Sequence, residues 1–163
     1  MTKEEFRRAM SVLIEDVPGQ LFRDIERFHE KFDLPPTADP GHRLPDDLLV
    51  FRIRFLFEEL QEYCIAVGHM ITVADETGHV TTVCANEFNP EQAFDALIDL
   101  VYVALGTAFL HRFNFNAGWE RVQAANMAKE RATGADDPRS KRHSAADIVK
   151  PEGWRPASLK DLL

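Results

Sequence analysis

Five carboxylates lie at helical spacing on two apolar stretches of the chain. The first stretch carries Glu58, Glu59 and Glu62, and the second carries Asp95 and Asp99. The glutamates are three and four residues apart, so one face of a helix can present all three. The second stretch is apolar nearly all round, which is typical of a buried helix. Buried carboxylates need a neutralising partner, and a divalent cation neutralises several at once, so the two stretches predict a metal site.

The residues beside these carboxylates favour an enclosed site. Asp95, Asp99, Tyr102 and Gly106 share one stripe of the second predicted helix, at about 100° per residue. On the first predicted helix, the glutamates continue a face that begins with two phenylalanines, which we expect to lie away from bulk water. For the three glutamates alone, a solvated acidic helix end is the alternative interpretation.

Length and charge limit the class of protein. A chain of 163 residues is one domain by length, and 45% hydrophobic and 28% charged residues are ordinary for a globular protein. A net charge of −8 argues against a nucleic acid polymer as partner, because no domain-wide basic field meets the phosphates. A small anionic ligand stays compatible with this charge, because a metal ion and a few lysines or arginines can meet it locally.

The cysteines and the apolar runs indicate the compartment. Cys64 and Cys84 are too few for a disulfide framework, and we expect reduced thiols, with a single disulfide as the alternative. The chain starts with charged residues and shows no apolar signal region. No apolar run approaches the roughly 18 residues that span a bilayer. We therefore expect a cytoplasmic protein without a membrane partner.

Apolar periodicity and turn residues predict a mostly helical chain. In chain order we expect helices over 2–16 and 18–32, a loop over 33–45, a helix to about 68, a β-hairpin within 70–84, and helices over 90–111 and 117–131. Asn89 is the predicted N-cap of the helix that carries the aspartates, and Asn116 is the predicted N-cap of the last helix. The expected fold class is therefore all-α, a bundle of four to five helices with a short hairpin insertion.

The C-terminal part differs in composition from the rest. Residues 132–146 are small, polar and charged, so we expect a mobile loop there, followed by an apolar tail that docks back. We interpret residues 1–131 as a helical catalytic domain. Residues 132–163 would then be a flexible loop and a C-terminal lid segment of the same domain.

The order of the acidic motifs points to a family. Glu58-Glu59-x-x-Glu62 followed by Asp95-x-x-x-Asp99 resembles the all-α nucleoside triphosphate pyrophosphohydrolases. These are the MazG-like proteins and their relatives, the dimeric dUTPases and the phosphoribosyl-ATP pyrophosphohydrolases. Further segments are similar to the early helix, the late-helix phosphate motif and the closing C-terminal segment of these proteins, namely residues 28–32, 126–129 and 150–156.

The resemblance implies a metal-dependent hydrolase. Glu59, Glu62 and Asp99 would bind Mg²⁺, with Mn²⁺ as an alternative, and Asp95 would be a fourth ligand. Glu58 would orient or deprotonate the attacking water. The family usually has an acidic residue three positions before the last aspartate, where this chain has Ala96. The distance between the two acidic motifs is also longer than usual, and the predicted hairpin accounts for the extra length.

The resemblance also implies the substrate and the assembly. Asn126 and Lys129 would contact phosphate, Lys150 and Trp154 would bind substrate from the tail, and His29 would line the nucleoside pocket. A lysine that favours a helix end, and a tryptophan that only anchors the tail, are the structural alternatives. The expected reaction converts a (d)NTP to a (d)NMP and pyrophosphate, as in house-cleaning of the nucleotide pool. A homodimer or a dimer of dimers is expected.

Two other classes of protein compete with this interpretation. A di-iron carboxylate bundle also places acids on facing helices, but it needs two Glu-x-x-His units, and only Glu26-x-x-His29 qualifies here. A non-enzymatic helical interaction module, with solvated acidic residues, is the third. Iron in the purified protein would indicate the di-iron bundle. A lack of thermal stabilisation by Mg²⁺ with nucleotide would indicate the interaction module.

Overall fold

The structure is a computed structural model that describes residues 18–163, except residues 38, 74–79 and 85–86. It has two compact units, which divide between Arg112 and Phe113. The described residues are mostly helical, so the predicted all-α class is confirmed. The helix predicted over 2–16 lies outside the described residues.

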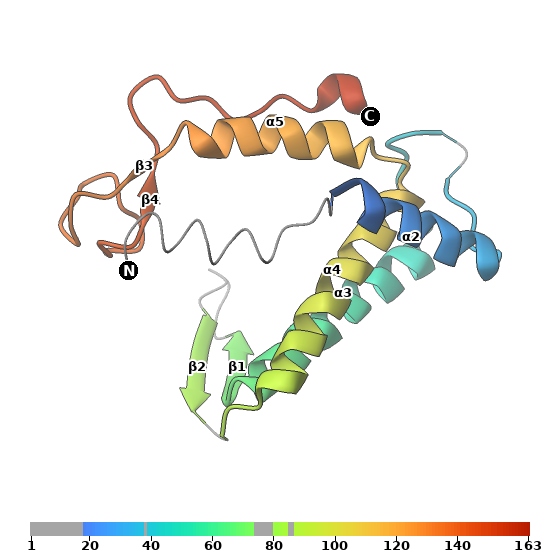
Figure 1. Ribbon diagram of the computed structural model, residues 1–163, viewed down its shortest axis with the longest axis horizontal. Helices are drawn as coiled ribbons and strands as arrows, with labels where there is room; N and C mark the ends of the chain where they lie inside the picture. Colours follow the sequence, from blue (N-terminus) through green and yellow to red (C-terminus); the bar gives the residue numbers. More distant parts are fainter. Residues whose placement is uncertain (1–17, 38, 74–79, 85–86) are drawn as a thin grey trace. The chain divides into compact units, whose positions relative to one another are not determined.

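Three helices build the described part of the first unit. Helices α2 (Pro18–Lys31), α3 (Asp46–Ala66) and α4 (Pro90–Leu110) agree with the predicted ranges within a few residues. Helix α3 packs along α4, and α2 packs against α4 (Figure 1). Helix α4 begins as predicted, because the Asn89 side chain accepts a hydrogen bond of 3.1 Å from the Gln92 backbone N–H and proline occupies the first helical position.

The predicted hairpin is confirmed. Strands β1 (His69–Val73) and β2 (Val80–Cys84) are antiparallel, with His69 opposite Cys84. Gly68, at a φ of 79°, turns the chain from the end of α3 into β1. The insertion therefore leaves the pairing of α3 with α4 intact. Cys64, near the end of α3, has a free thiol, as expected.

Helix α4 differs from the expectation of a helix buried on all sides. Its buried residues are small or lie on one side, where α2 and α3 cover it. Elsewhere on α4, Phe94 is 67% exposed and Ile98 is 51% exposed, and Asp95 and Asp99 are exposed as well. The expectation failed because apolar periodicity shows that a helix buries its surface but does not identify the covering partner.

The expectation about apolar runs also needs correction. By length and composition alone, α4 could cross a membrane. The helix nevertheless carries Asp95 and Asp99 and packs against α2 and α3 through a third of its most apolar window. These features are those of a bundle helix, because carboxylates in a bilayer are costly.

The second unit contains the last helix, α5 (Phe115–Met127). Asn114 caps it, through a 3.4 Å hydrogen bond from the Ala117 backbone N–H, so the prediction of Asn116 as N-cap is wrong. The helix also ends four residues earlier than predicted. Residues Glu130–Arg131 instead form strand β3, which pairs antiparallel with β4 (Ile148–Val149).

The segment 132–146, which the sequence predicts to be a mobile loop, makes hydrogen bonds to two buried aspartates, Asp137 and Asp147. Asp137 accepts hydrogen bonds from the backbone N–H groups of Thr133 and Arg139 and from the Arg139 guanidinium. Asp147 accepts from the Ser140 hydroxyl at 2.9 Å and from Arg142 Nη1 at 2.6 Å. The polar side chains of this segment thus form hydrogen bonds with one another and with its backbone.

The tail docks back on α5, as predicted. The Trp154 indole N–H donates a 2.8 Å hydrogen bond to the Ala125 carbonyl. Near the C-terminus, Arg121 forms two 2.6 Å hydrogen bonds to the carboxylate of Asp161, in the short 3₁₀ helix η1 (Lys160–Leu162). This bidentate geometry fixes the tail along the helix.

Candidate active site

One of the five carboxylates is buried. Glu59 is only 7% exposed, whereas the other four carboxylates are exposed. Burial raises the pKa of Glu59 above its ordinary value, and repulsion adds to this effect, in decreasing order, from Glu62, Asp99, Glu58 and Asp95. Asp95 and Asp99 therefore act on Glu59 across the α3–α4 contact, and Glu58 and Glu62 act on it from within α3. Burial falls on a glutamate of α3, not on the aspartates of α4 as the sequence suggested.

The carboxylates suit a hard cation by their chemistry. All five offer oxygen ligands, which Mg²⁺ and Mn²⁺ prefer and zinc does not require. In the part of the chain that the structure describes, no three His, Cys, Asp or Glu side chains already form a group that could hold a metal ion. The donor set fits the cation, but the exposed carboxylates would have to turn toward Glu59 to complete a site.

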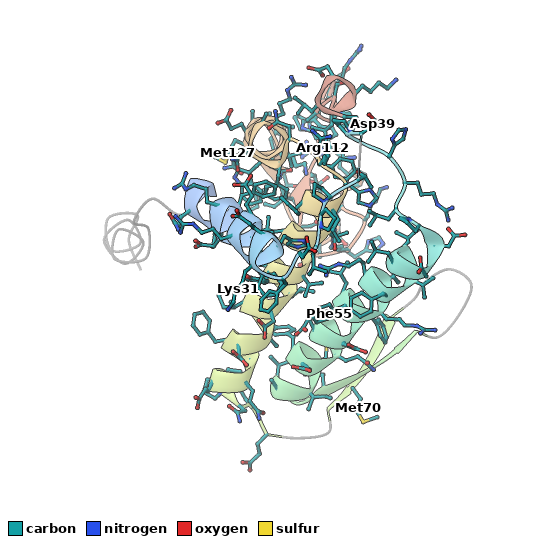
Figure 2. All side chains as sticks on the ribbon, turned by 90° about the vertical axis from the view of Figure 1, so that its right-hand side faces the viewer. Lys31, Asp39, Phe55, Met70, Arg112 and Met127 are labelled. Carbon is teal, nitrogen blue, oxygen red and sulfur yellow. The ribbon has the colours of Figure 1, made fainter. Side chains whose placement is uncertain are left out.

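A cavity of about 180 Å³ adjoins Glu59 between helices α2, α3 and α4. Its walls come from α2 (Phe28 and His29), α3 (Arg52, Phe55 and Glu59) and α4 (Asp99, Tyr102, Val103 and Gly106). Phe55, labelled in Figure 2, lies on the side of α3 that faces α4. The predicted stripe of α4 thus lines the cavity through Asp99, Tyr102 and Gly106, and His29 of α2 lines it as well. The cavity is thus lined both by aromatic rings and by two of the five carboxylates, Glu59 and Asp99.

Arg52 is the cavity residue that the sequence reasoning missed. It is 8% exposed, and among the described residues no carboxylate forms an ion pair with it. Its Nε donates to Thr107 Oγ1 at 3.0 Å and its Nη2 donates to the Val103 carbonyl at 2.6 Å. Burial lowers the pKa of this guanidinium. A signal was available, because Arg52 lies two helical turns before Glu59 and so shares its face.

His29 is held as a neutral imidazole. Its Nδ1 lies 3.1 Å from the Leu34 carbonyl, which can only accept, so Nδ1 carries the proton. Burial lowers the pKa of His29, the hydrogen bond to Leu34 opposes this, and the positive charge of Arg52 lowers the pKa further. Nε2 is then a bare acceptor. It lies 3.2 Å from the point where a Cβ on Gly106 would stand, and Arg52 Nη2 lies 3.1 Å from the same point.

The predicted substrate-binding residues of the second unit form one cluster. Lys129 Nζ donates a 2.8 Å hydrogen bond to Asn126 Oδ1 and lies 5.2 Å from the centre of the Trp154 ring. Lys150 Nζ lies 4.6 Å from the same ring. Two ammonium groups thus gather at one indole, from the end of α5 and from the tail. Arg139 and Arg142, in contrast, are engaged with acidic side chains of their own segment.

A comparison with models of known protein families gives one match. Residues 25–126 match the model of phosphoribosyl-ATP pyrophosphohydrolase, and this range is more than half of the chain. The match spans α3 and α4 with all five carboxylates and the cavity beside them. A comparison with curated proteins found no match. The resemblance noted from the acidic motifs is confirmed: the chain belongs to the phosphoribosyl-ATP pyrophosphohydrolase family, whose activity is that of a nucleotide pyrophosphohydrolase.

Proposed function

We propose that this chain hydrolyses (d)NTPs to (d)NMPs and pyrophosphate with Mg²⁺ or Mn²⁺ as cofactor, in house-cleaning of the nucleotide pool. The observation that carries this proposal is the buried Glu59 with four further carboxylates acting on it. Such a group is repulsive by itself, and a divalent cation together with a polyphosphate converts the repulsion into binding. The family match supports the hydrolase class.

Each carboxylate has a proposed role. Glu59, Glu62 and Asp99 hold the cation, and Asp95 is the fourth ligand. When bound, the cation polarises the phosphate oxygens and stabilises charge on the leaving pyrophosphate. Glu58 orients a water molecule and accepts its proton as the water oxygen bonds to the α phosphorus. The bond from that phosphorus to the oxygen that bridges it to the β phosphorus breaks, and pyrophosphate leaves with the bridging oxygen.

The cluster around Trp154 is proposed to bind the substrate's phosphates. Lys129 and Lys150 bring two positive charges to one aromatic ring, and Asn126 fixes the direction of Lys129. Phosphate oxygens are the anions that such a pair of ammonium groups attracts in this reaction. We propose that the tail acts as a lid in this way.

A second copy of the chain is proposed to cover apolar side chains of α3 and α4, giving a homodimer or a dimer of dimers. The support is the number of large apolar side chains that are exposed on these two helices, among them Phe51, Ile53, Phe94 and Ile98. Phe94→Ser should lower the mass measured by light scattering on a sizing column. A monomeric unmodified protein would overturn this part of the proposal.

A nucleotide panel tests the reaction. Each (d)NTP is incubated with Mg²⁺, with Mn²⁺ or with EDTA, and pyrophosphate is measured separately from orthophosphate. We expect pyrophosphate only with the cations, and a loss of at least about a hundredfold in kcat for Glu58→Gln. Glu120→Gln, an exposed glutamate of α5, is the matched control. Orthophosphate as the first product, or full activity in EDTA, would overturn the proposal.

A further inference from the structure

Arg52 is a buried cation that keeps donors to spare. Its two hydrogen bonds occupy Nε and one N–H of Nη2. A guanidinium has five N–H donors, and among the described residues no acceptor reaches Nη1. Nη1 is not among the described atoms that are both fully buried and unpaired, so it stays accessible to solvent or to a ligand. Since Arg52 lines the cavity beside Glu59, a ligand in that cavity is placed to supply the acceptor.

His29 offers the opposite property at the same wall. Its Nδ1 is used by the Leu34 carbonyl, which leaves Nε2 as an acceptor. Gly106 allows both groups to approach, because a Cβ there would meet Arg52 Nη2 at 3.1 Å and His29 Nε2 at 3.2 Å. The wall therefore presents a fixed donor beside a fixed acceptor.

The other walls suit a flat ring. Phe28, Phe55 and Tyr102 line the cavity, and the rings of Phe28 and Tyr102 meet edge to face at 5.3 Å between centroids. Aromatic side chains stack on a base of any kind, so they supply affinity without selecting among bases. Glu59 and Asp99 line the same cavity, so a base held there lies next to the carboxylates that are proposed to bind the cation. Selection is then left to Arg52 and His29.

We propose that Arg52 and His29 select nucleotides by a lactam edge of the base, a ring carbonyl next to a ring N–H. Arg52 donates to the carbonyl oxygen, and His29 Nε2 accepts from the N–H. Uracil, thymine, guanine and hypoxanthine carry this edge. Cytosine and adenine carry instead an amino group next to a bare ring nitrogen, with donor and acceptor exchanged. The inference rests on the proposed function, and it names the substrate class of the same site.

Two matched pairs of nucleotides test the edge alone. UTP and CTP differ only in it, as do ITP and ATP. We expect kcat/KM to favour UTP over CTP and ITP over ATP by about tenfold or more, since a hydrogen bond to a charged donor is worth about that factor. In Arg52→Gln both ratios should approach one. Arg52→Gln should lose much less activity with a deoxyribose triphosphate without a base than with UTP, because this substrate has no base edge for Arg52 to bind.

Gly106→Ala provides a second variant that keeps Arg52. The added methyl group crowds both Arg52 and His29, so KM should rise more for UTP and ITP than for the baseless substrate. Gly118→Ala in α5 is the matched control, because its Cβ would meet only Leu159, at an ordinary 4.0 Å. Both variants gain similar helix propensity, which separates the local effect from a change in stability.

The outcomes are distinguishable. Pyrophosphate from all nucleotides with no preference within either pair overturns the inference and leaves the proposed function standing. Equal losses with UTP and with the baseless substrate in Arg52→Gln assign Arg52 a structural role and also overturn it. If no nucleotide yields pyrophosphate in the unmodified protein, the proposed function fails, and the inference falls with it.

Discussion

The buried Glu59 should make the metal-free protein less stable than it would be with a neutral side chain. Glu59→Gln keeps the shape of the residue and removes its charge. The carboxylate is 7% exposed and the described residues offer it no hydrogen-bond donor, so its charge is unpaired without a cation. We therefore expect Glu59→Gln to melt at a higher temperature than the unmodified protein at neutral pH in EDTA.

The size of the effect follows from the neighbours. Glu62 lies one turn from Glu59, at roughly 6 Å, where two charges repel by about 0.7 kcal/mol in water and about 3 kcal/mol at an effective dielectric constant of 20. Glu62 is exposed, so the lower value applies. With three further carboxylates and the cost of burial, Glu59→Gln should gain about 2 kcal/mol. For a chain of this length that is a rise of about 4–8 °C.

The pH dependence gives an independent check. The pKa of Glu59 is raised above 4.5 in the folded state, so folded protein holds the proton more tightly than unfolded protein. The free energy of unfolding then falls as pH rises from about 4.5 through the folded-state pKa, and stays lower above it. The advantage of Glu59→Gln should therefore vanish near pH 4 and be complete at neutral pH.

The test is to measure melting curves of the unmodified protein and of Glu59→Gln, each in EDTA and in Mg²⁺, at pH 4 and at pH 7. Mg²⁺ should raise the melting temperature of the unmodified protein and leave Glu59→Gln unchanged. Glu120→Gln, on the exposed face of α5, controls for the general effect of removing one negative charge. A lower melting temperature for Glu59→Gln in EDTA at neutral pH would refute the reasoning, because it would show that the carboxylate has a stabilising partner.

Three further predictions concern single side chains. Asp99→Asn should abolish pyrophosphate release and stabilisation by Mg²⁺, with equal or higher metal-free stability, since it removes one repulsion on Glu59; destabilisation in EDTA would contradict this. Arg139 and the backbone of Thr133 hold the pKa of Asp137 well below 3.8, so the stability that Asp137 contributes should be lost as pH falls below about 4; Asp137→Asn should melt earlier at neutral pH and lose this acid dependence in circular dichroism melts. Trp154→Phe removes the hydrogen bond to Ala125 and weakens the contacts with Lys129 and Lys150, so it should cost about 1 kcal/mol and raise KM for nucleotides, whereas an unchanged KM would leave Trp154 as an anchor only.

Local signals in the sequence predicted the elements that depend on local chemistry. Asn89 and Pro90 mark the start of α4 because both act within one helical turn. The choice between Asn114 and Asn116 was less local. Arg112, at a φ of 55°, turns the chain just before Asn114. An arginine rarely adopts a positive φ, so its presence does not predict this turn. The early end of α5 depends on strand pairing with Ile148–Val149, a partner far along the chain.

The site shows the same division. The spacing of the acidic residues predicted which carboxylates act on one another, and the stripe through Asp99, Tyr102 and Gly106 predicted one wall of the cavity. Arg52 escaped prediction because its acceptors are a backbone carbonyl and a hydroxyl on α4, more than fifty residues away. A backbone carbonyl has no signature in a sequence. Arg52 becomes part of the cavity wall only because α3 packs on α4.

The exposure of α4 connects the assembly to the chemistry. Asp95 and Asp99 alternate along the helix with exposed Phe94 and Ile98, so a partner that covers these apolar side chains must also approach the aspartates. The proposed second copy would thereby remove water from the carboxylates and strengthen every charge interaction among them. Such burial is tolerable only with a cation present, since unneutralised carboxylates would oppose it. Association and cation binding should then be coupled: Mg²⁺ should tighten the dimer, and EDTA should loosen it by the same factor.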